Sequence, residues 1–292
     1  MIDYKIMKWA WVLVFLSCQG DSSKLRVLFS LPKKLKEVSG ITITSQSDLI
    51  WVVEDSGNEN VIYGLTFNGK IAQSIVLKDA VNNDWEEITR DNEGNLYVGD
   101  FGNNDNIRQD LAIYKIAKDS LALPIAAISS KISFYYPEQT EFPPKKTKKF
   151  FDCEAFFEMN GYFYLFTKNR SKGFDGTTFL YKIPNQSGHH AAILVGSFQT
   201  CSQYNQCVIT AAALSPDKKK MALLGHSNVW LFENYSDDSF LKGTITQYDL
   251  AHFSQKEAIT FKDNNTLLIA DERTKKVGGF VYEIGLQDLK SK

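Results

Sequence analysis

The sequence predicts an all-β protein, a five-bladed β-propeller, on three observations. The 292 residues are 43% hydrophobic and 23% charged, with a formal net charge of −1. This ordinary globular composition excludes disordered, collagen-like and coiled-coil proteins. Short stretches rich in Val, Ile, Tyr, Phe and Leu alternate with turn sequences such as DNEGN, SPDKK and KDNN, which is typical of strands. A related pattern recurs five times, and such repetition is typical of propeller blades.

The N-terminal segment predicts an export signal. Lys5 and Lys8 precede the apolar run Ala10–Leu16. This run is too short for a membrane-spanning helix of about 20 residues and fits a secretory signal. The sequence FLSC, ending at Cys18, is similar to a bacterial lipobox. We therefore expect residues 1–17 to be a signal peptide and Cys18 to carry lipid. An ordinary signal peptide or a membrane-anchoring stub is the alternative.

The lipid sets the expected location. Residues 18–24 would be the lipidated cysteine and a polar, flexible tether. The chain has no later apolar stretch long enough to span a membrane, so the lipid would be its membrane attachment. We expect an outer-membrane lipoprotein of a bacterial cell envelope.

Residues 25–288 are predicted to form one propeller domain. Residues 25–31 precede the first repeat and are expected to supply the outer strand of the last blade. The repeats begin at Ser39, Glu86, Glu154, Thr210 and Glu257. The shorter intervals match the about 40–50 residues of a four-stranded blade, and the longer ones carry insertions such as the Pro- and Lys-rich stretch 137–149. A sixth, degenerate blade inside the long second repeat is the alternative.

The cysteines after residue 18 predict one disulfide. Cys201 and Cys207 bracket the polar segment SQYNQ, and the compartment outside the inner membrane permits disulfides. Cys153 lies among apolar residues and is expected to be a buried free thiol. The four histidines form no metal motif such as HExxH.

Four stretches together resemble a known family. They are WEEIT…NLYVGDFGNN…IR…IYKI, DCEAFF…YFYLFTKNR, VITAAALSPDKKKMALL and KEAITF…TLLIADE, between about residues 37 and 283. As a set they resemble secreted bacterial propellers related to the esterase-like phytase domain. Members of that family mostly lack an assigned activity, so the resemblance implies a fold more than a reaction.

The residues that open the repeats carry a second resemblance. Ser39, Glu86, Glu154, Thr210 and Glu257 are similar in order to residues of the calcium-activated apyrases. Those five-bladed propellers hold Ca²⁺ on the central axis with one Ser or Glu from each inner strand. The resemblance implies an axial Ca²⁺ here, which suits crowded carboxylates. Ser39 and Thr210 are weak ligands, Glu87 rivals Glu86 because a one-residue shift reverses the side chain, and a water-filled channel is the alternative.

Polar residues after the second strand of each blade are expected to gather at one mouth of the channel. The candidate catalytic residues are Asp100 and Asp55. The candidate ligand-binding residues are Arg108, Lys168, Arg170, His226, Asp271 and Arg273. Arg and Lys match anionic oxygens, and Asp can hold a metal or act as a base. The alternative for each is a turn or a surface ion pair, since strand-end Asp and Asn build turns.

Two functions are compatible with these predictions. The first is a monomeric, calcium-stabilised lipoprotein that binds a small anionic ligand or a cell-envelope protein. The second is a calcium-dependent phosphoester or nucleotide hydrolase, in which Asp100 or Asp55 orients water and the cationic side chains bind phosphate. No nucleophile elbow or phosphate loop is present, so the binding module is preferred. The near-zero net charge argues against a nucleic-acid partner.

Overall fold

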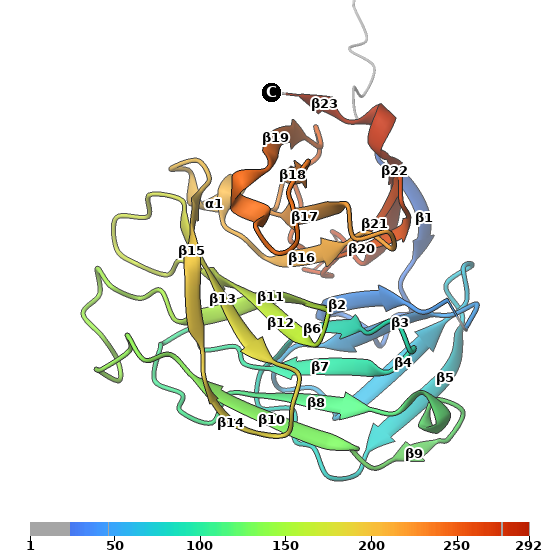
Figure 1. The fold of residues 1–292 in the computed structure, drawn as a ribbon. Coiled ribbons are helices and arrows are strands. Elements are labelled where there is room, and N and C mark those ends of the chain that lie inside the picture. Colours follow the sequence, from blue (N-terminus) through green and yellow to red (C-terminus); the bar gives the residue numbers. More distant parts are fainter. Residues whose placement is uncertain (1–23, 46, 276, 292) are drawn as a thin grey trace, which may run out of the picture.

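The chain forms five β-sheets arranged around a common centre (Figure 1), in a computed structural model that describes residues 24–45, 47–275 and 277–291. Each sheet is one blade, so the predicted five-bladed propeller is confirmed. The proposed signal peptide and Cys18 lie outside the described residues. None of the described helices is long and apolar enough to cross a membrane.

The first two blades each contain five strands. From the centre outward, blade 1 has β2 (Val38–Ile43), β3 (Ile50–Glu54), β4 (Val61–Leu65), β5 (Ile71–Leu77) and β9 (Ile125–Ala126). Blade 2 has β6 (Trp85–Arg90), β7 (Leu96–Asp100), β8 (Ala112–Ile116), β10 (Ser130–Tyr135) and β14 (Gly188–Ala191).

The remaining blades follow the same order. Blade 3 has β11 (Asp152–Met159), β12 (Tyr162–Lys168), β13 (Thr177–Pro184) and β15 (Ile193–Gln199). Blade 4 has β16 (Ala211–Leu214), β17 (Lys220–Leu224), β18 (Asn228–Glu233), β19 (Thr244–Asp249) and β23 (Lys290–Ser291). Blade 5 has β20 (Lys256–Asp263), β21 (Thr266–Asp271), β22 (Phe280–Gly285) and β1 (Arg26–Ser30).

The ring closes through the N-terminal strand. β1 pairs antiparallel with β22 and forms the outer edge of blade 5, as the sequence predicts. Each inner strand contacts the next, and β20 returns to β2. A closed ring of this kind leaves only short sheet edges exposed. The strand β23 lies beyond residue 288, where the sequence analysis ends the propeller.

The long second repeat does not contain a sixth blade, so that alternative is wrong. Its extra residues form β9, which pairs in parallel with β5 of the preceding blade, and β10, the fourth strand of blade 2. β14, from the following repeat, pairs in parallel with β10. The added segments therefore fasten neighbouring blades together.

The apolar core consists of five clusters, one between each pair of adjacent blades. The cluster between blades 2 and 3 contains the aromatic side chains Tyr97, Phe101, Phe134, Phe156 and Phe163. Facing sheets bury the alternate side chains of both partners. The abundant aromatic residues thus fill the spaces between blades.

Short helices occupy the connections. They are η1 (Lys118–Ser120), α1 (Tyr204–Cys207), η2 (Phe240–Lys242) and η3 (Leu286–Asp288). Cys201 and Cys207 form a disulfide across α1, with their Cα atoms 5.4 Å apart. Cys153 is a buried free thiol.

Candidate functional site

Bulges in the inner strands bring the residues that open the repeats to equivalent places. Ser39, Glu86, Glu154 and Glu257 each lie at a register shift between the first and second strands of their blade. Such a bulge adds one residue to the strand and re-aims its side chain. Thr210, directly before β16, takes the corresponding place in blade 4. The sequence repeat therefore marks one structural position in all five blades.

The two hydroxyl residues of this set join neighbouring blades. The Ser39 hydroxyl donates a hydrogen bond to the Trp85 carbonyl oxygen, 2.7 Å away. The Thr210 hydroxyl donates to the Lys256 carbonyl oxygen, 2.8 Å away. Each accepting residue immediately precedes the bulged glutamate of the next blade. Both hydroxyls thus hold inner strands together beside the channel.

The glutamates of blades 3 and 5 share a buried ammonium group. Lys168 Nζ lies 3.0 Å from Glu154 Oε2 and 3.8 Å from Glu257 Oε2. Arg170 contacts the other oxygen of Glu154 at 2.8 Å. Burial alone would raise the pKa of Glu154, but Lys168 and Arg170 bring it below its ordinary value. An internal cation therefore lies between two of the predicted axial ligands.

The remaining axial glutamate, Glu86, lies among carboxylates. One oxygen each of Asp55, Asp84 and Glu86 lies within 4.8 Å of the others, and the same holds for Glu86, Asp152 and Glu154. We call these five residues the acidic cluster. Glu86 belongs to both groups. Among the described residues, two members of the predicted ligand set, Glu86 and Glu154, are thus gathered with aspartates.

Burial and mutual repulsion both disfavour ionisation in the acidic cluster. Burial, then the charge of Asp55, raises the pKa of Asp84 to about 7. Burial, then the charge of Glu154, raises the pKa of Asp152 to about 7 and that of Glu86 well above its ordinary value. The Oδ1 atom of Asp84 is buried without a hydrogen-bond partner, in a side chain from a residue 9% exposed. A cation or protons must offset this concentration of negative charge.

A missing side chain lets the acidic cluster form. A Cβ atom on Gly102 would lie 2.1 Å from Glu86 Oε1 and 2.5 Å from Asp84 Oδ2. These contacts are too close for any larger residue. The glycine of the VGDFGNN stretch therefore provides the space in which two carboxylates meet.

Glu87, the rival to Glu86, lies inside the channel. Its Oε1 accepts hydrogen bonds from the backbone amides of Ile41, at 3.2 Å, and Ile88, at 3.0 Å. Burial raises the pKa of Glu87 well above its ordinary value. Its hydrogen bonds join the inner strands of blades 1 and 2. Of the two neighbouring glutamates, Glu86 belongs to the acidic cluster.

The predicted catalytic Asp100 has a structural role. It is completely buried. Its oxygens accept hydrogen bonds from the Asp84 amide at 3.1 Å, Arg108 at 3.0 Å and the Tyr114 hydroxyl at 3.1 Å. Arg108 also bonds Asp110 and the Gly102 carbonyl oxygen. These partners fix the loop after β7 and occupy both carboxylate oxygens of Asp100, so that neither oxygen is directed at water.

Blade 5 repeats this arrangement. Asp271 is completely buried and accepts hydrogen bonds from the Phe280 amide and the Tyr282 hydroxyl, both at 2.8 Å. Arg273 donates to the Leu31 carbonyl oxygen at 2.8 Å. These two residues therefore hold blade 5 and the segment after β1, and lie outside the candidate site.

The other predicted residues meet at the mouth. Asp55 joins the acidic cluster, and Arg170 Nε lies 2.5 Å from Asp152 Oδ2. His226 Nε2 lies 3.2 Å from Glu257 Oε1. Lys168, Arg170 and His226 thus pair with carboxylates of the site.

Sequence reasoning missed two acids of this mouth, Asp84 and Asp152, whereas Glu272 directly follows the predicted Asp271. The sequence holds a signal for the two missed acids, because the pattern D-x-E recurs as Asp84-Trp85-Glu86 and Asp152-Cys153-Glu154. Burial, then the charges of Glu257 and Asp55, raises the pKa of Glu272 to about 8. Glu272 therefore extends the region of unfavourable negative charge toward blade 5.

Comparisons with known proteins show the fold. No protein-family model matches the chain, and curated protein sequences give no match. The crystal structure of the nidogen/laminin complex contains a similar chain, with a TM-score of 0.51 and 11% identity over 91% of this chain and 90% of that one. A Kuenenia stuttgartiensis hydrazine synthase chain aligns with a TM-score of 0.42 and 12% identity, over 80% of this chain and 61% of that one. The relation to phytase-like propellers and apyrases stays a prediction.

Proposed function

We propose that this protein is a propeller binding module of the bacterial cell envelope, tethered by lipid on Cys18 and stabilised by Ca²⁺ at the acidic cluster. Its loop-bearing face would bind a small anionic ligand or another envelope protein. A β-propeller is compatible with protein binding, and the similar chain comes from the structure of a nidogen/laminin complex.

The acidic cluster carries the proposal for Ca²⁺. Each of its two groups of three residues, which share Glu86, gathers hard carboxylate oxygens within 4.8 Å of one another, and Ca²⁺ takes six to eight oxygen ligands. Asp84 Oδ1 is buried without a partner, and a bound cation would supply one. Because the Lys168 ammonium lies between Glu154 and Glu257, we place the ion beside Asp55, Asp84 and Glu86 instead of on the axis.

The same contacts favour binding over phosphoester hydrolysis. Lys168 and Arg170 are paired with Glu154, so a phosphate would have to displace a buried carboxylate. Asp100, the preferred water-orienting acid, has hydrogen-bond donors on both oxygens. The hydrolase is therefore the less favoured function.

Thermal unfolding with chelator and then with added Ca²⁺ tests the cation. A ligand that binds only the folded state adds about 2.7 kcal/mol at 100 times its Kd, or about 5 °C for a domain of this size. Glu86→Gln should abolish most of this shift, whereas Glu59→Gln, which alters an exposed acid outside the acidic cluster, should keep it. Equal unfolding temperatures for wild type with and without Ca²⁺ would overturn the proposed calcium site.

Fractionation of cells tests the tether. Cys18→Ser should abolish incorporation of labelled lipid and release the protein into a soluble envelope or secreted fraction. Unchanged lipid labelling and membrane retention would exclude Cys18 as the anchor.

A further inference from the structure

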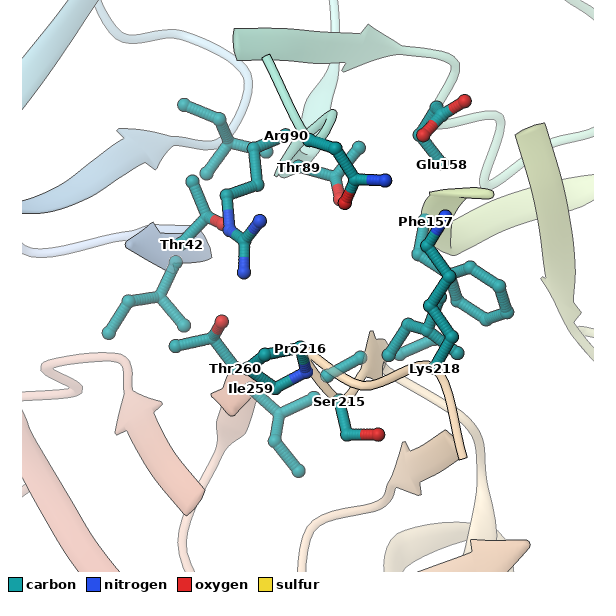
Figure 2. A pocket seen from close by; sticks show the side chains of 16 residues that line it. Thr42, Thr89, Arg90, Phe157, Glu158, Ser215, Pro216, Lys218, Ile259 and Thr260 are labelled. Atoms are coloured by element: carbon teal, nitrogen blue, oxygen red, sulfur yellow. The ribbon is translucent and has the colours of Figure 1, made fainter. Parts of the chain in front are cut away.

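A second polar opening lies at the other end of the channel, where the inner strands end. Figure 2 shows side chains from several blades around it, among them Thr42, Arg90, Glu158, Lys218 and Thr260. Ile41, Ile88 and Ile259 line its inner part and are nearly inaccessible. Together with Glu87, these side chains separate the opening from the acidic cluster.

Arg90 is the cation without a partner in this opening. Its guanidinium extends into the space enclosed by the labelled side chains (Figure 2). Within the described part of the chain, it makes none of the hydrogen bonds or ion pairs that hold Lys168, Arg170 and Arg108. Asp91, whose charge acts on Arg90, already accepts bonds from the Asn95 side chain and the Tyr97 hydroxyl. A partly buried guanidinium with free donors is a binding group for an anion.

Three threonines beside Arg90 supply further donors. Thr42, Thr89 and Thr260 come from the inner strands of blades 1, 2 and 5 and line the opening. All three residues are buried, at 4%, 9% and 8% exposure. In the described structure their hydroxyls have no protein hydrogen-bond partner, unlike those of Ser39 and Thr210. Buried polar groups are normally satisfied, so these hydroxyls are available to water or a ligand.

The size and charge of the opening select the ligand. The cavity has a volume of about 40 Å³, which is room for a few waters and too little for a nucleotide or a sugar. Lys218 Nζ is engaged by Asn160 Oδ1 at 2.7 Å, and Glu158 lies across the opening from Arg90 (Figure 2). The charges of Lys218 and Glu158 act on each other and offset, so the positive charge of Arg90 remains and matches a single negative charge.

We propose that this opening binds one carboxylate group, held by the Arg90 guanidinium and the hydroxyls of Thr42, Thr89 and Thr260. A guanidinium can donate two parallel hydrogen bonds to a carboxylate. The carboxylate comes either from a free small acid or from an acidic side chain that a partner protein inserts. The proposal is independent of Ca²⁺ at the acidic cluster.

The experiment follows the Arg90 Nε–Hε resonance by NMR in a buffer free of other oxyanions. The probes are acetate, inorganic phosphate, and the blocked peptides acetyl-Gly-Asp-Gly-amide and acetyl-Gly-Asn-Gly-amide. We expect saturable binding of acetate, of the Asp peptide or of both, and none of the Asn peptide. Arg90→Gln, followed through the Thr89 and Thr260 amides, should weaken binding about tenfold or more, as expected for a lost bond to a charged group. Thr260→Val should weaken it severalfold. Arg26→Gln, at the outer edge of blade 5, should leave it unchanged.

The probes separate the two sources of the carboxylate. Binding of the Asp peptide without acetate binding would assign the carboxylate to a partner's side chain, and acetate binding alone would assign it to a free acid. The proposal would be overturned if neither acetate nor the Asp peptide binds. It would also be overturned if the Arg90→Gln variant unfolds as wild type does and binds the carboxylate equally well. Tighter binding of phosphate than of either carboxylate would also overturn it, because the opening would then select a greater charge.

Discussion

The two ends of the channel carry opposite chemistry on the same inner strands. Glu86 is the second residue of β6 and Arg90 is its last, four residues or about 13 Å further along. At the acidic end, Lys168 and Arg170 each pair with buried carboxylates. At the other end, Arg90 has no partner within the described residues. Charge at the acidic end is therefore part of what holds the fold, whereas Arg90 is free to serve a ligand.

The difference follows from how the strands begin and end. The bulges at the first end turn one side chain per blade toward its neighbours, and the inserted acids must then be neutralised. The opposite ends of these strands leave hydroxyls and one guanidinium around an opening.

Removing the ammonium from the acidic end should cause the largest loss. Lys168→Met leaves Glu154 and Glu257 buried without their shared cation, and breaking a buried pair in this way costs about 3–5 kcal/mol. Urea unfolding in chelator measures the change. Adding Glu154→Gln to Lys168→Met should restore part of the loss, since it removes one unpaired charge. A loss below about 1 kcal/mol for Lys168→Met would mean that the ammonium is not needed to hold the acids.

Raising the pH should destabilise the same end in chelator. Glu272 has a folded-state pKa of about 8 and Asp84 one of about 7, both above their unfolded values. Between about pH 5 and pH 8 the folded state therefore binds more protons than the unfolded state, and each such proton lowers stability by up to about 1.4 kcal/mol per pH unit. Lys256, whose pKa burial lowers to about 8, adds stability only above that pH.

The measurement is the urea midpoint from pH 5 to pH 8. Glu272→Gln should flatten the decline, because its amide does not titrate. Saturating Ca²⁺ should also flatten it by favouring the ionised carboxylates. A midpoint that rises steadily over this range in chelator would contradict the raised pKa values.

Substitution of Glu87, which lies between the two ends of the channel, should reduce stability less. Glu87→Ala removes the acceptor of the Ile41 and Ile88 amides, and an unsatisfied buried group costs about 1–3 kcal/mol. Glu87→Gln keeps an acceptor oxygen and should lose less. Urea unfolding of both variants checks the order. Equal losses would show that the charge of Glu87, and not its hydrogen bonds, is what the channel requires.

The sequence was sufficient for the fold because the repeat is periodic. The residues that open the five repeats occupy one equivalent place, and residues 25–31 contain the closing strand. The alternative of a sixth blade arose from the length of the second repeat, part of which forms β9, a short strand that pairs with the preceding blade. This pairing is long-range and leaves no periodic signal.

The sites were predicted less well because they depend on contacts between blades. In the sequence, Asp100 and Asp55 occupy similar positions at the end of a second strand. In the structure, Asp100 is buried and bonded by the Tyr114 hydroxyl, whereas Asp55 belongs to the acidic cluster. Lys168 of blade 3 lies 3.8 Å from Glu257 of blade 5, a residue far away in the sequence. The sequence does not single out Arg90, because this residue ends a strand just before an ordinary turn sequence. Its enclosed position arises only when the blades form a ring.

Arg90→Gln should have the smallest effect on stability and is the sharpest test of the contrast. Because the Arg90 side chain makes no hydrogen bond or ion pair within the described residues, its loss leaves no buried carboxylate unpaired, and substitutions away from such features usually change stability by less than about 0.5 kcal/mol. Urea unfolding of Arg90→Gln beside Lys168→Met, without added carboxylate, compares one cation at each end. Similar losses for both would mean that Arg90 also has a structural partner in the folded protein. A negligible loss for Arg90→Gln alone would leave its guanidinium, exposed to the opening and unpaired, as a group kept for binding.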